Sequence, residues 1–212
     1  MSRDVVVSPP GMEDRPPLST RDVLINAAMP VFRSNGYELT TVDDIARSAG
    51  LTTGAIYASF ASKDELFYAA VSLVEDRFES WVGDAVRDLP RASSVKDRLA
   101  AYLHATAAFL QAEPDLMAFR SSSWVDLARQ PEIGRARGSL PARRREFLLG
   151  LLKGAGVTGR SSLSRAGLVD VILMAAEGIA SAQIDTVVPK TTSMTALTPV
   201  IEHLLLGDST DG

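Results

Sequence analysis

The stretch from Thr41 to Phe60 constrains the fold more than any other part of the chain. Apolar residues recur in its first half at i, i+3, i+4 and i+7, which is the spacing of one face of a short helix. They are Val42, Ile45, Ala46 and Ala49. Thr41 precedes them as a helix N-cap. Gly50 follows as a helix stop, because glycine enters the left-handed conformation without a Cβ penalty.

A second short helix is predicted to begin directly after Gly50. Thr52 or Thr53 can cap it, and its buried side would consist of Leu51, Ile56 and Phe60. Two short helices joined by a tight glycine-containing turn form a helix-turn-helix. The second of these helices is the one that would enter a DNA major groove, where base edges can be distinguished.

The outward residues of this motif suit contact with DNA. Small residues at the start of the second helix let its backbone approach the bases, and the hydroxyls of Tyr57 and Ser59 can donate to phosphates. Ser62 and Glu65 indicate a capping box on the next helix, and Lys63 in its first turn is predicted to meet a phosphate. The predicted DNA-contacting residues are Thr41, Thr52, Thr53, Gly54, Ala55, Tyr57, Ser59 and Lys63.

The stretch from Ala28 to Leu66 resembles the DNA-binding segment of the TetR-type transcriptional regulators. The matching positions are Phe32, Gly36, Tyr37, Thr40, Thr41, Val42, Ile45, Ala46, Ala49, Gly50, Leu51, Gly54, Ile56, Tyr57, Phe60, Ser62, Lys63, Asp64, Glu65 and Leu66. The resemblance implies a dimeric, DNA-binding, ligand-responsive regulator with no catalytic activity. This chain has Ser59 where the family often has His, and Ala58 where a larger residue is common.

The net charge of the chain does not support the DNA-binding interpretation. The chain has a net charge of −4, and from Thr20 to Glu65 the acidic residues outnumber the basic ones. The basic residues there are Arg21, Arg33, Arg47 and Lys63, and the acidic ones are Asp22, Glu38, Asp43, Asp44, Asp64 and Glu65. The interpretation therefore depends on the residue pattern, and it predicts a shallow dependence of DNA affinity on salt.

Length and periodicity predict an all-α protein with an N-terminal three-helix helix-turn-helix domain and a helical-bundle body. The resemblance implies that this body binds a ligand and dimerises. A chain of 212 residues with 46% hydrophobic residues can bury such a core. We expect a disordered arm at 1–18, the DNA-binding domain at 19–65, the body at 66–206 and a polar tail at 207–212. No apolar run approaches the ~20 residues of a membrane span and no signal peptide is apparent, so we expect a cytoplasmic protein without a membrane partner.

The last two predicted helices, at about 162–183 and 192–206, are expected to form the homodimer. The first is apolar nearly all round, which indicates burial on two sides, one of them against a partner. The resemblance implies the same pairing across a two-fold axis, and a palindromic operator needs such a dimer.

Aromatic and methionine side chains on different body helices are candidates for an effector cavity, and each is also a candidate for ordinary core packing. They are Tyr102, Phe109, Met117, Trp124 and Met174. Glu177 lies in an apolar helix and must be paired if it is buried, so it would anchor a ligand or a dimer contact. A basic cluster, Arg135, Arg137, Arg143, Arg144 and Arg145, is interpreted as a face that pairs with acidic neighbours, or as an anion-binding entrance.

One rival motif points to an enzyme. Gly154, Gly156 and Gly159 match the dinucleotide fingerprint, but the residues before them are helical in pattern and no alternating strands occur. A glycine linker is favoured. His104 and His203 lack neighbours at metal-ligand spacing, and the chain has no cysteine, so we expect no catalytic site, metal or cofactor.

The sequence therefore predicts a homodimeric repressor that binds double-stranded palindromic operator DNA and is released by a small, largely apolar effector. Activation and a ligand-free mode stay open. Two other classes also stay open, namely a dinucleotide-binding enzyme that uses the Gly154 to Gly159 loop and a helical interaction protein that does not bind DNA.

Overall fold

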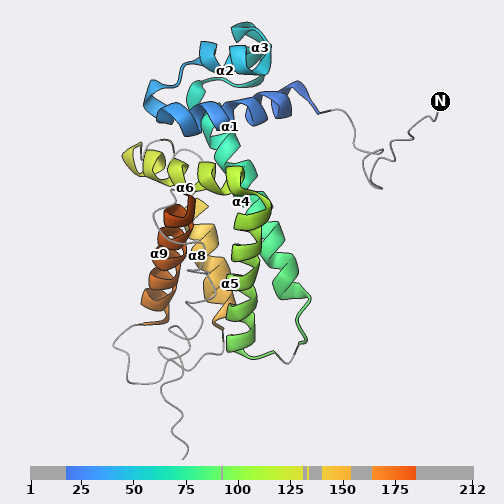
Figure 1. The fold of residues 1–212 in the computed structure, drawn as a ribbon, viewed down its shortest axis with the longest axis vertical. Coiled ribbons are helices and arrows are strands. Elements are labelled where there is room, and N and C mark those ends of the chain that lie inside the picture. Colours follow the sequence, from blue (N-terminus) through green and yellow to red (C-terminus); the bar gives the residue numbers. More distant parts are fainter. Residues whose placement is uncertain (1–17, 92, 131–132, 134–139, 154–163, 185–212) are drawn as a thin grey trace, which may run out of the picture.

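The computed structural model describes residues 18–91, 93–130, 133, 140–153 and 164–184. Its helices are α1 (Thr20–Leu39), α2 (Val42–Ala49), α3 (Thr53–Ser59), α4 (Lys63–Arg87), α5 (Val95–Ala112), α6 (Pro114–Arg129), α8 (Leu140–Leu151) and α9 (Arg165–Ile184). These described residues contain no strand, and the all-α prediction is confirmed. Helices α1, α2 and α3 form a head at one end, α4 runs from the head into the body, and α6 lies across the body directly beneath α1 (Figure 1).

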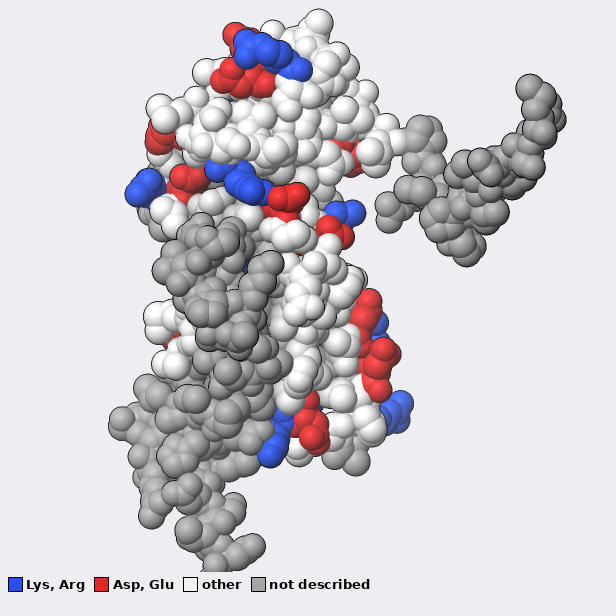
Figure 2. Space-filling model, in the orientation of Figure 1, with Lys and Arg blue, Asp and Glu red and all other residues white. Residues whose placement is uncertain are grey.

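Charged side chains are spread over the head and the body in small groups of both signs. Figure 2 shows blue and red atoms next to one another on this face, and no broad blue area forms over the head. Within the described ranges, no helix has the length and apolar character needed to cross a bilayer.

Local capping signals set the helix starts in the head. Thr41 Oγ1 accepts from the backbone N–H of Asp44 at 3.1 Å, and the Asp44 carboxylate accepts from the backbone N–H of Thr41 at 3.2 Å, a complete capping box. Gly50 ends α2 in the left-handed conformation, with φ 66°. At α4 the predicted box is only half formed, because Glu65 Oε2 accepts from the N–H of Ala61 and not of Ser62.

Helix α1 is interrupted at Gly36 and stays helical at Pro30. Gly36 has φ 73° and ψ 166°, backbone angles that are open to glycine and closed to L side chains. The chain resumes for one short turn and stops at the cap residue Thr40, whose hydroxyl donates to Gly36 O at 2.7 Å. The regular part of α1 therefore ends at Asn35 and Gly36.

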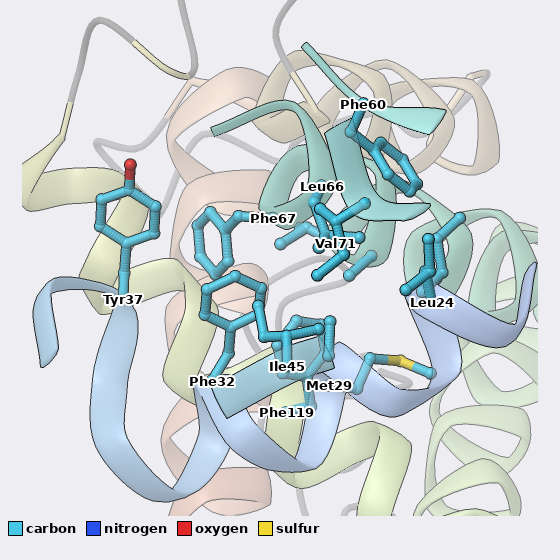
Figure 3. Close-up of a cluster of buried hydrophobic side chains, with 14 of the residues drawn as sticks. Leu24, Met29, Phe32, Tyr37, Ile45, Phe60, Leu66, Phe67, Val71 and Phe119 are labelled. Carbon is cyan, nitrogen blue, oxygen red and sulfur yellow. The ribbon is translucent and has the colours of Figure 1, made fainter. Parts of the chain in front are cut away.

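The head has its own hydrophobic core, and this core continues into the body. Figure 3 shows buried side chains from the four N-terminal helices together with Phe119 of α6. The ring of Phe67 on α4 lies 4.9 Å from the rings of both Phe32 and Tyr37, and 6.4 Å from that of Phe119. Apolar packing thus joins α1, α4 and α6 across the predicted domain boundary at residue 65. Leu51, predicted to be buried with them, is 37% exposed.

A second core fills the body between α4, α5, α6, α8 and α9. Helix α9 contributes Leu168, Val169, Ile172 and Ala176, which are buried. Its opposite side carries Met174, which is 67% exposed. One side of α9 is therefore covered by its own subunit, and the other side is exposed.

Several predictions fall on residues outside the described ranges. They concern most of the 1–18 arm, the Gly154 to Gly159 loop, Arg135, Arg137, His203, the segment 192–206 and the tail 207–212.

Candidate nucleic-acid interface and body site

Helix α3 is anchored on one side and open on the other. Ile56 and the cap residue Phe60 are 1% and 2% exposed and enter the head core, whereas Tyr57 between them is 60% exposed. Thr52 is the N-cap of α3, since its Oγ1 accepts from the backbone N–H of Ala55 at 3.3 Å. Because no charged residue occurs in α3, its outward side offers hydroxyls, a phenol ring and a glycine backbone.

The predicted DNA-contacting residues lie on α2, on α3 and at the start of α4, in the outer part of the head (Figure 1). Thr41, Thr52, Gly54 and Tyr57 are exposed, and Thr53, Ala55, Ser59 and Lys63 are half-buried. None is fully buried. The hydroxyls of Thr41 and Thr52 cap helices, and both residues remain exposed.

Arg21 on α1 supports the far end of α3, a role that the sequence did not reveal. Its Nη1 donates to the carbonyl oxygen of Ser59 at 2.7 Å, and its guanidinium carbon lies 4.1 Å from the centre of the Phe60 ring. Arg21 Nη2 is also 3.7 Å from Glu65. One side chain thus connects the C-terminal end of α3, the turn after it and α4.

Lys63 has partners inside the protein. Its Nζ donates to the carbonyl oxygens of Tyr37 at 2.8 Å and Thr40 at 3.0 Å, and lies 4.2 Å from the centre of the Tyr37 ring. These carbonyls end α1, where a cation is favoured by the helix dipole. The phosphate contact predicted for Lys63 would have to be made in addition to this capping role.

All four basic side chains of the head are engaged within the chain. Besides Arg21 and Lys63, Arg33 pairs with Asp115 of α6 at 2.5 Å and Arg47 pairs with Asp44 at 3.1 Å. Hydrogen bonds from the Thr41 side chain and backbone, together with Arg47, hold the pKa of Asp44 below its ordinary value, so its negative charge persists near the α2 N-terminus. The head therefore presents no excess of positive charge around α3.

The predicted ligand residues of the body fall into three groups. Tyr102, Phe109 and Met117 are buried in the body core, and Trp124 is half-buried. Tyr102 lines a small cavity of about 10 Å³ with Phe78, Glu79, Val82, Arg144 and Phe147. Met174 does not join this group, since it faces outward from α9.

Glu177 is paired, as a carboxylate in an apolar helix must be. Its Oε1 accepts from Arg144 Nη2 at 2.6 Å and from Arg120 Nη1 at 2.7 Å. Burial raises the pKa of Glu177, but the charges of Arg120 and Arg144 lower it further, so its pKa lies below the ordinary value. Both alternatives offered for Glu177 assumed an outside partner; in the described chain its partners are two arginines of α6 and α8.

The network extends to α4 through residues that the sequence analysis missed. Arg120 Nε is 2.9 Å from Glu75 Oε1, and both side chains are 1% exposed. Burial tends to lower the pKa of Arg144, but Glu177, Tyr102 and Glu75 raise it above its ordinary value. Arg143 pairs with Asp76 and Glu79, and Arg145 with Asp170, so these two members of the basic cluster do pair with acidic neighbours.

Comparison with known proteins adds the family. Residues 24–70 match the family described as "Bacterial regulatory proteins, tetR family". The chain is 31% identical over 122 residues to the HTH-type transcriptional regulator HbdR of Aromatoleum sp. (strain CIB), a match that covers 57% of this chain and 50% of HbdR. The chain therefore matches about half the length of that relative.

Solved structures resemble the whole fold at low identity. A transcriptional regulator from Rhodococcus sp. Rha1 has a TM-score of 0.73 at 21% identity, with 89% of this chain and 97% of that one covered. FadR from Bacillus subtilis, solved in complex with stearoyl-CoA, has a TM-score of 0.64 at 20% identity, with 87% and 97% covered. Residues 24–70, which contain the exposed α3, therefore match the tetR family of bacterial regulatory proteins, and the chain shares the fold of these solved regulators.

Proposed function

We propose that this protein is a ligand-responsive transcriptional repressor that binds a palindromic operator as a homodimer. The observation that carries the proposal is the placement of α3, whose Ile56 and Phe60 fix it to the head core while Tyr57 is 60% exposed. A short helix held in this way at the outer end of a domain fits the major groove of DNA.

The DNA contacts in this proposal are those predicted from the sequence. Thr53, Gly54 and Ala55 would approach base edges, and the hydroxyls of Tyr57 and Ser59 would donate to phosphates. Thr41, Thr52 and Lys63 would add contacts from the starts of α2, α3 and α4, where free backbone N–H groups also favour an anion. With its cations already paired, the head would depend on hydrogen bonds and shape more than on ion pairs.

The homodimer would form through α9 and the segment 192–206. Met174 and Gly178 are exposed on α9, on the side away from the buried residues Val169, Ile172 and Ala176. An exposed methionine beside a glycine lets a second helix approach closely and bury apolar area. Two heads related by a two-fold axis would then read the two halves of the operator.

The proposed domains are a head at 19–65 and a body at 66–206, which are connected by α4 and by the contact of α6 with α1. Helix α4 is continuous from the head into the body, and α6 contacts α1 through Phe119 and through Asp115 with Arg33. An effector that binds better to a body conformation with altered α4 and α6 positions would change the spacing of the heads and release DNA. FadR of Bacillus subtilis, similar in fold, has been solved with stearoyl-CoA.

Selection of bound sequences from a random DNA pool tests the proposal. A palindrome whose half-sites are about one helical turn apart, or a multiple of that, is expected for a two-fold dimer. Recovery of no common sequence would reject operator binding, and recovery of single half-sites would reject the dimer.

Gel shifts with the selected DNA then test the α3 surface. Tyr57→Ala and Thr53→Ala should each weaken binding about tenfold, the effect of one or two hydrogen bonds. Ser34→Ala, an exposed change on α1 of the same head, is the matched control and should leave affinity unchanged. Equal affinity of all three variants and the parent would show that another surface contacts DNA.

A further inference from the structure

Buried polar atoms without a hydrogen-bond partner are concentrated in the body. Among the described residues they belong to α4, α5, α6 and α8, namely Glu79, Tyr102, Ser121, Trp124 and Arg144, besides Glu75 and Arg120, which form an ion pair with each other at 2.9 Å. Native proteins pair the great majority of such atoms. Their concentration in the body, with none in the head, indicates a place that receives hydrogen-bonding groups from outside the chain.

Three of these atoms belong to side chains that line one cavity. The hydroxyl of Tyr102, Nε of Arg144 and Oε1 of Glu79 have no partner, and all three residues border the cavity of about 10 Å³ between α4, α5 and α8. Tyr102 and Arg144 are 2% and 7% exposed, so bulk water does not satisfy them. The remaining wall is apolar and consists of Phe78, Val82 and Phe147.

The three unpartnered atoms indicate which chemical group of a ligand could form hydrogen bonds with all of them. Arg144 Nε can only donate, Glu79 Oε1 can only accept while ionised, and the Tyr102 hydroxyl can do either. A hydroxyl group accepts and donates at one atom and so complements all three. A cavity of about 10 Å³ has room for one water molecule, whose place the ligand hydroxyl would take. The apolar wall would take a hydrocarbon or aromatic portion of the same molecule.

Charge at the cavity argues against an ionic ligand. Arg144 is already paired with Glu177 at 2.6 Å, and Glu79 with Arg143 at 2.6 Å. A carboxylate placed here would face Glu79, and an ammonium would face Arg144. Either ion would also lose its hydration shell, and no unpaired opposite charge in the cavity would compensate for that loss.

We propose that the effector is a neutral, mainly apolar alcohol or phenol whose hydroxyl is held by Tyr102, Arg144 and Glu79. This inference rests on the proposed ligand-responsive function and specifies its ligand class. A benzene-sized guest needs a cavity of about 150 Å³, so α8 must separate from α4 for it to enter. Helix α4 connects the body to the head, so its displacement would move the head. A ligand that binds the opened body and not the closed one would favour the opened conformation, and such a difference in affinity is what release of DNA requires.

Calorimetry on the full chain without DNA tests the ligand class. The probes are benzyl alcohol, benzoate, benzylammonium and toluene, which share one ring and differ in the polar group. Benzyl alcohol should bind at least about tenfold more tightly than each of the others, a difference equivalent to one or two buried hydrogen bonds. Tyr102→Phe should weaken benzyl alcohol about fivefold to tenfold and leave toluene unchanged.

Thr106→Val is the matched control for Tyr102→Phe. It removes another buried hydroxyl from α5, one that donates to Tyr102 O at 2.8 Å and does not line the cavity. Benzyl alcohol affinity should be unchanged in this variant. Benzoate, benzylammonium or toluene binding as tightly as benzyl alcohol, no binding of any probe, or no effect of Tyr102→Phe would each overturn the proposed class. Because DNA is absent, these outcomes are independent of whether the chain binds an operator.

Discussion

The backbone N–H of Tyr37 donates a 3.1 Å hydrogen bond to Oδ2 of Asp126, which joins the last turn of α1 to α6. The donor is available because Gly36, with φ 73° and ψ 166°, interrupts the helical hydrogen-bond pattern immediately before it. Glu38 contacts Gln130 and Arg33 pairs with Asp115 along the same two helices. The head is thus attached to α6 by polar contacts at both ends of the α1 and α6 crossing, around the apolar Phe119.

Removing the Asp126 carboxylate should weaken this attachment. We expect Asp126→Ala to lower the free energy of unfolding by about 1–2 kcal/mol, because a half-buried backbone N–H loses its charged acceptor. It should also reduce the effect of an effector on DNA affinity, since α6 is one of the two routes between head and body. Urea denaturation measures the first effect and gel shifts with effector the second.

Asp115→Ala is the control for Asp126→Ala. The Asp115 side chain is 89% exposed, and its pair with Arg33 is a surface ion pair that contributes less than about 1 kcal/mol. Equal destabilisation by the two variants would contradict the role given to the Tyr37 N–H.

Gly36 should not tolerate a side chain, for conformational reasons alone. A Cβ at this position would meet no atom closer than Asp126 Oδ1 at 4.0 Å, so space is available. The backbone angles are nevertheless unfavourable for alanine, and Gly36→Ala should lower the free energy of unfolding by about 1–3 kcal/mol. A thermal or urea transition that matches the parent would show that α1 can continue through this position.

Gly54→Ala should separate stability from DNA binding. Gly54 lies in the first turn of α3, and an added Cβ would make only an ordinary contact with Thr52 Oγ1 at 3.6 Å. Alanine is the better helix former, so stability should rise by roughly 0.5–1 kcal/mol. The added methyl group would stand on the surface that approaches the bases, so operator affinity should fall about tenfold or more. Unchanged affinity would place the N-terminus of α3 away from DNA.

The local features of the head were predictable because their partners are close in sequence. Thr41 needs only Asp44 for its capping box, and Gly50 needs only its own conformational freedom. The apolar spacing likewise predicted that Ile56 would be buried. The break in α1 lies at Gly36 and not at Pro30, and the contact of the Tyr37 N–H with Asp126 favours it there.

The body network was not predicted, although its residues carry a signal. Glu75 lies between Val71 and Phe78 at helical spacing, so a charged residue occupies a core position of α4. Its partner Arg120 lies on another helix, and helix periodicity does not indicate which helices meet. Met174 was predicted to line a cavity, but it is exposed. On a helix that is apolar on all sides, the sequence pattern does not reveal which side faces the subunit's own core.

Lys63→Met should distinguish helix capping from phosphate contact. The internal contacts with Tyr37 and Thr40 predict a loss of about 1 kcal/mol of stability, because two carbonyls lose a charged donor. If capping is its whole role, the slope of log affinity against log salt should equal that of the parent. A phosphate contact would reduce the slope by about 0.9 per head. Filter binding over a series of salt concentrations, with urea denaturation of the same protein, gives both numbers.

The pairing of Glu177 makes a prediction about acid. Arg120 and Arg144 bring the pKa of Glu177 in the folded protein below its ordinary value of 4.5, so the unfolded chain takes up this proton at a higher pH. The resulting stability is present above about pH 4.5 and is lost as the pH falls through the folded-state pKa.

Glu177→Gln removes that contribution at every pH. At pH 7 the variant should be less stable than the parent by about 2 kcal/mol, because two buried guanidinium groups lose their shared carboxylate. The difference between the two proteins should narrow below about pH 4.5, since the parent then becomes protonated and the variant cannot. Glu146→Gln, an exposed change on α8, should differ from the parent by less than about 0.5 kcal/mol throughout. A difference for Glu177→Gln that stays constant down to acid pH would show that the ion pair with Arg120 and Arg144 does not stabilise the folded body.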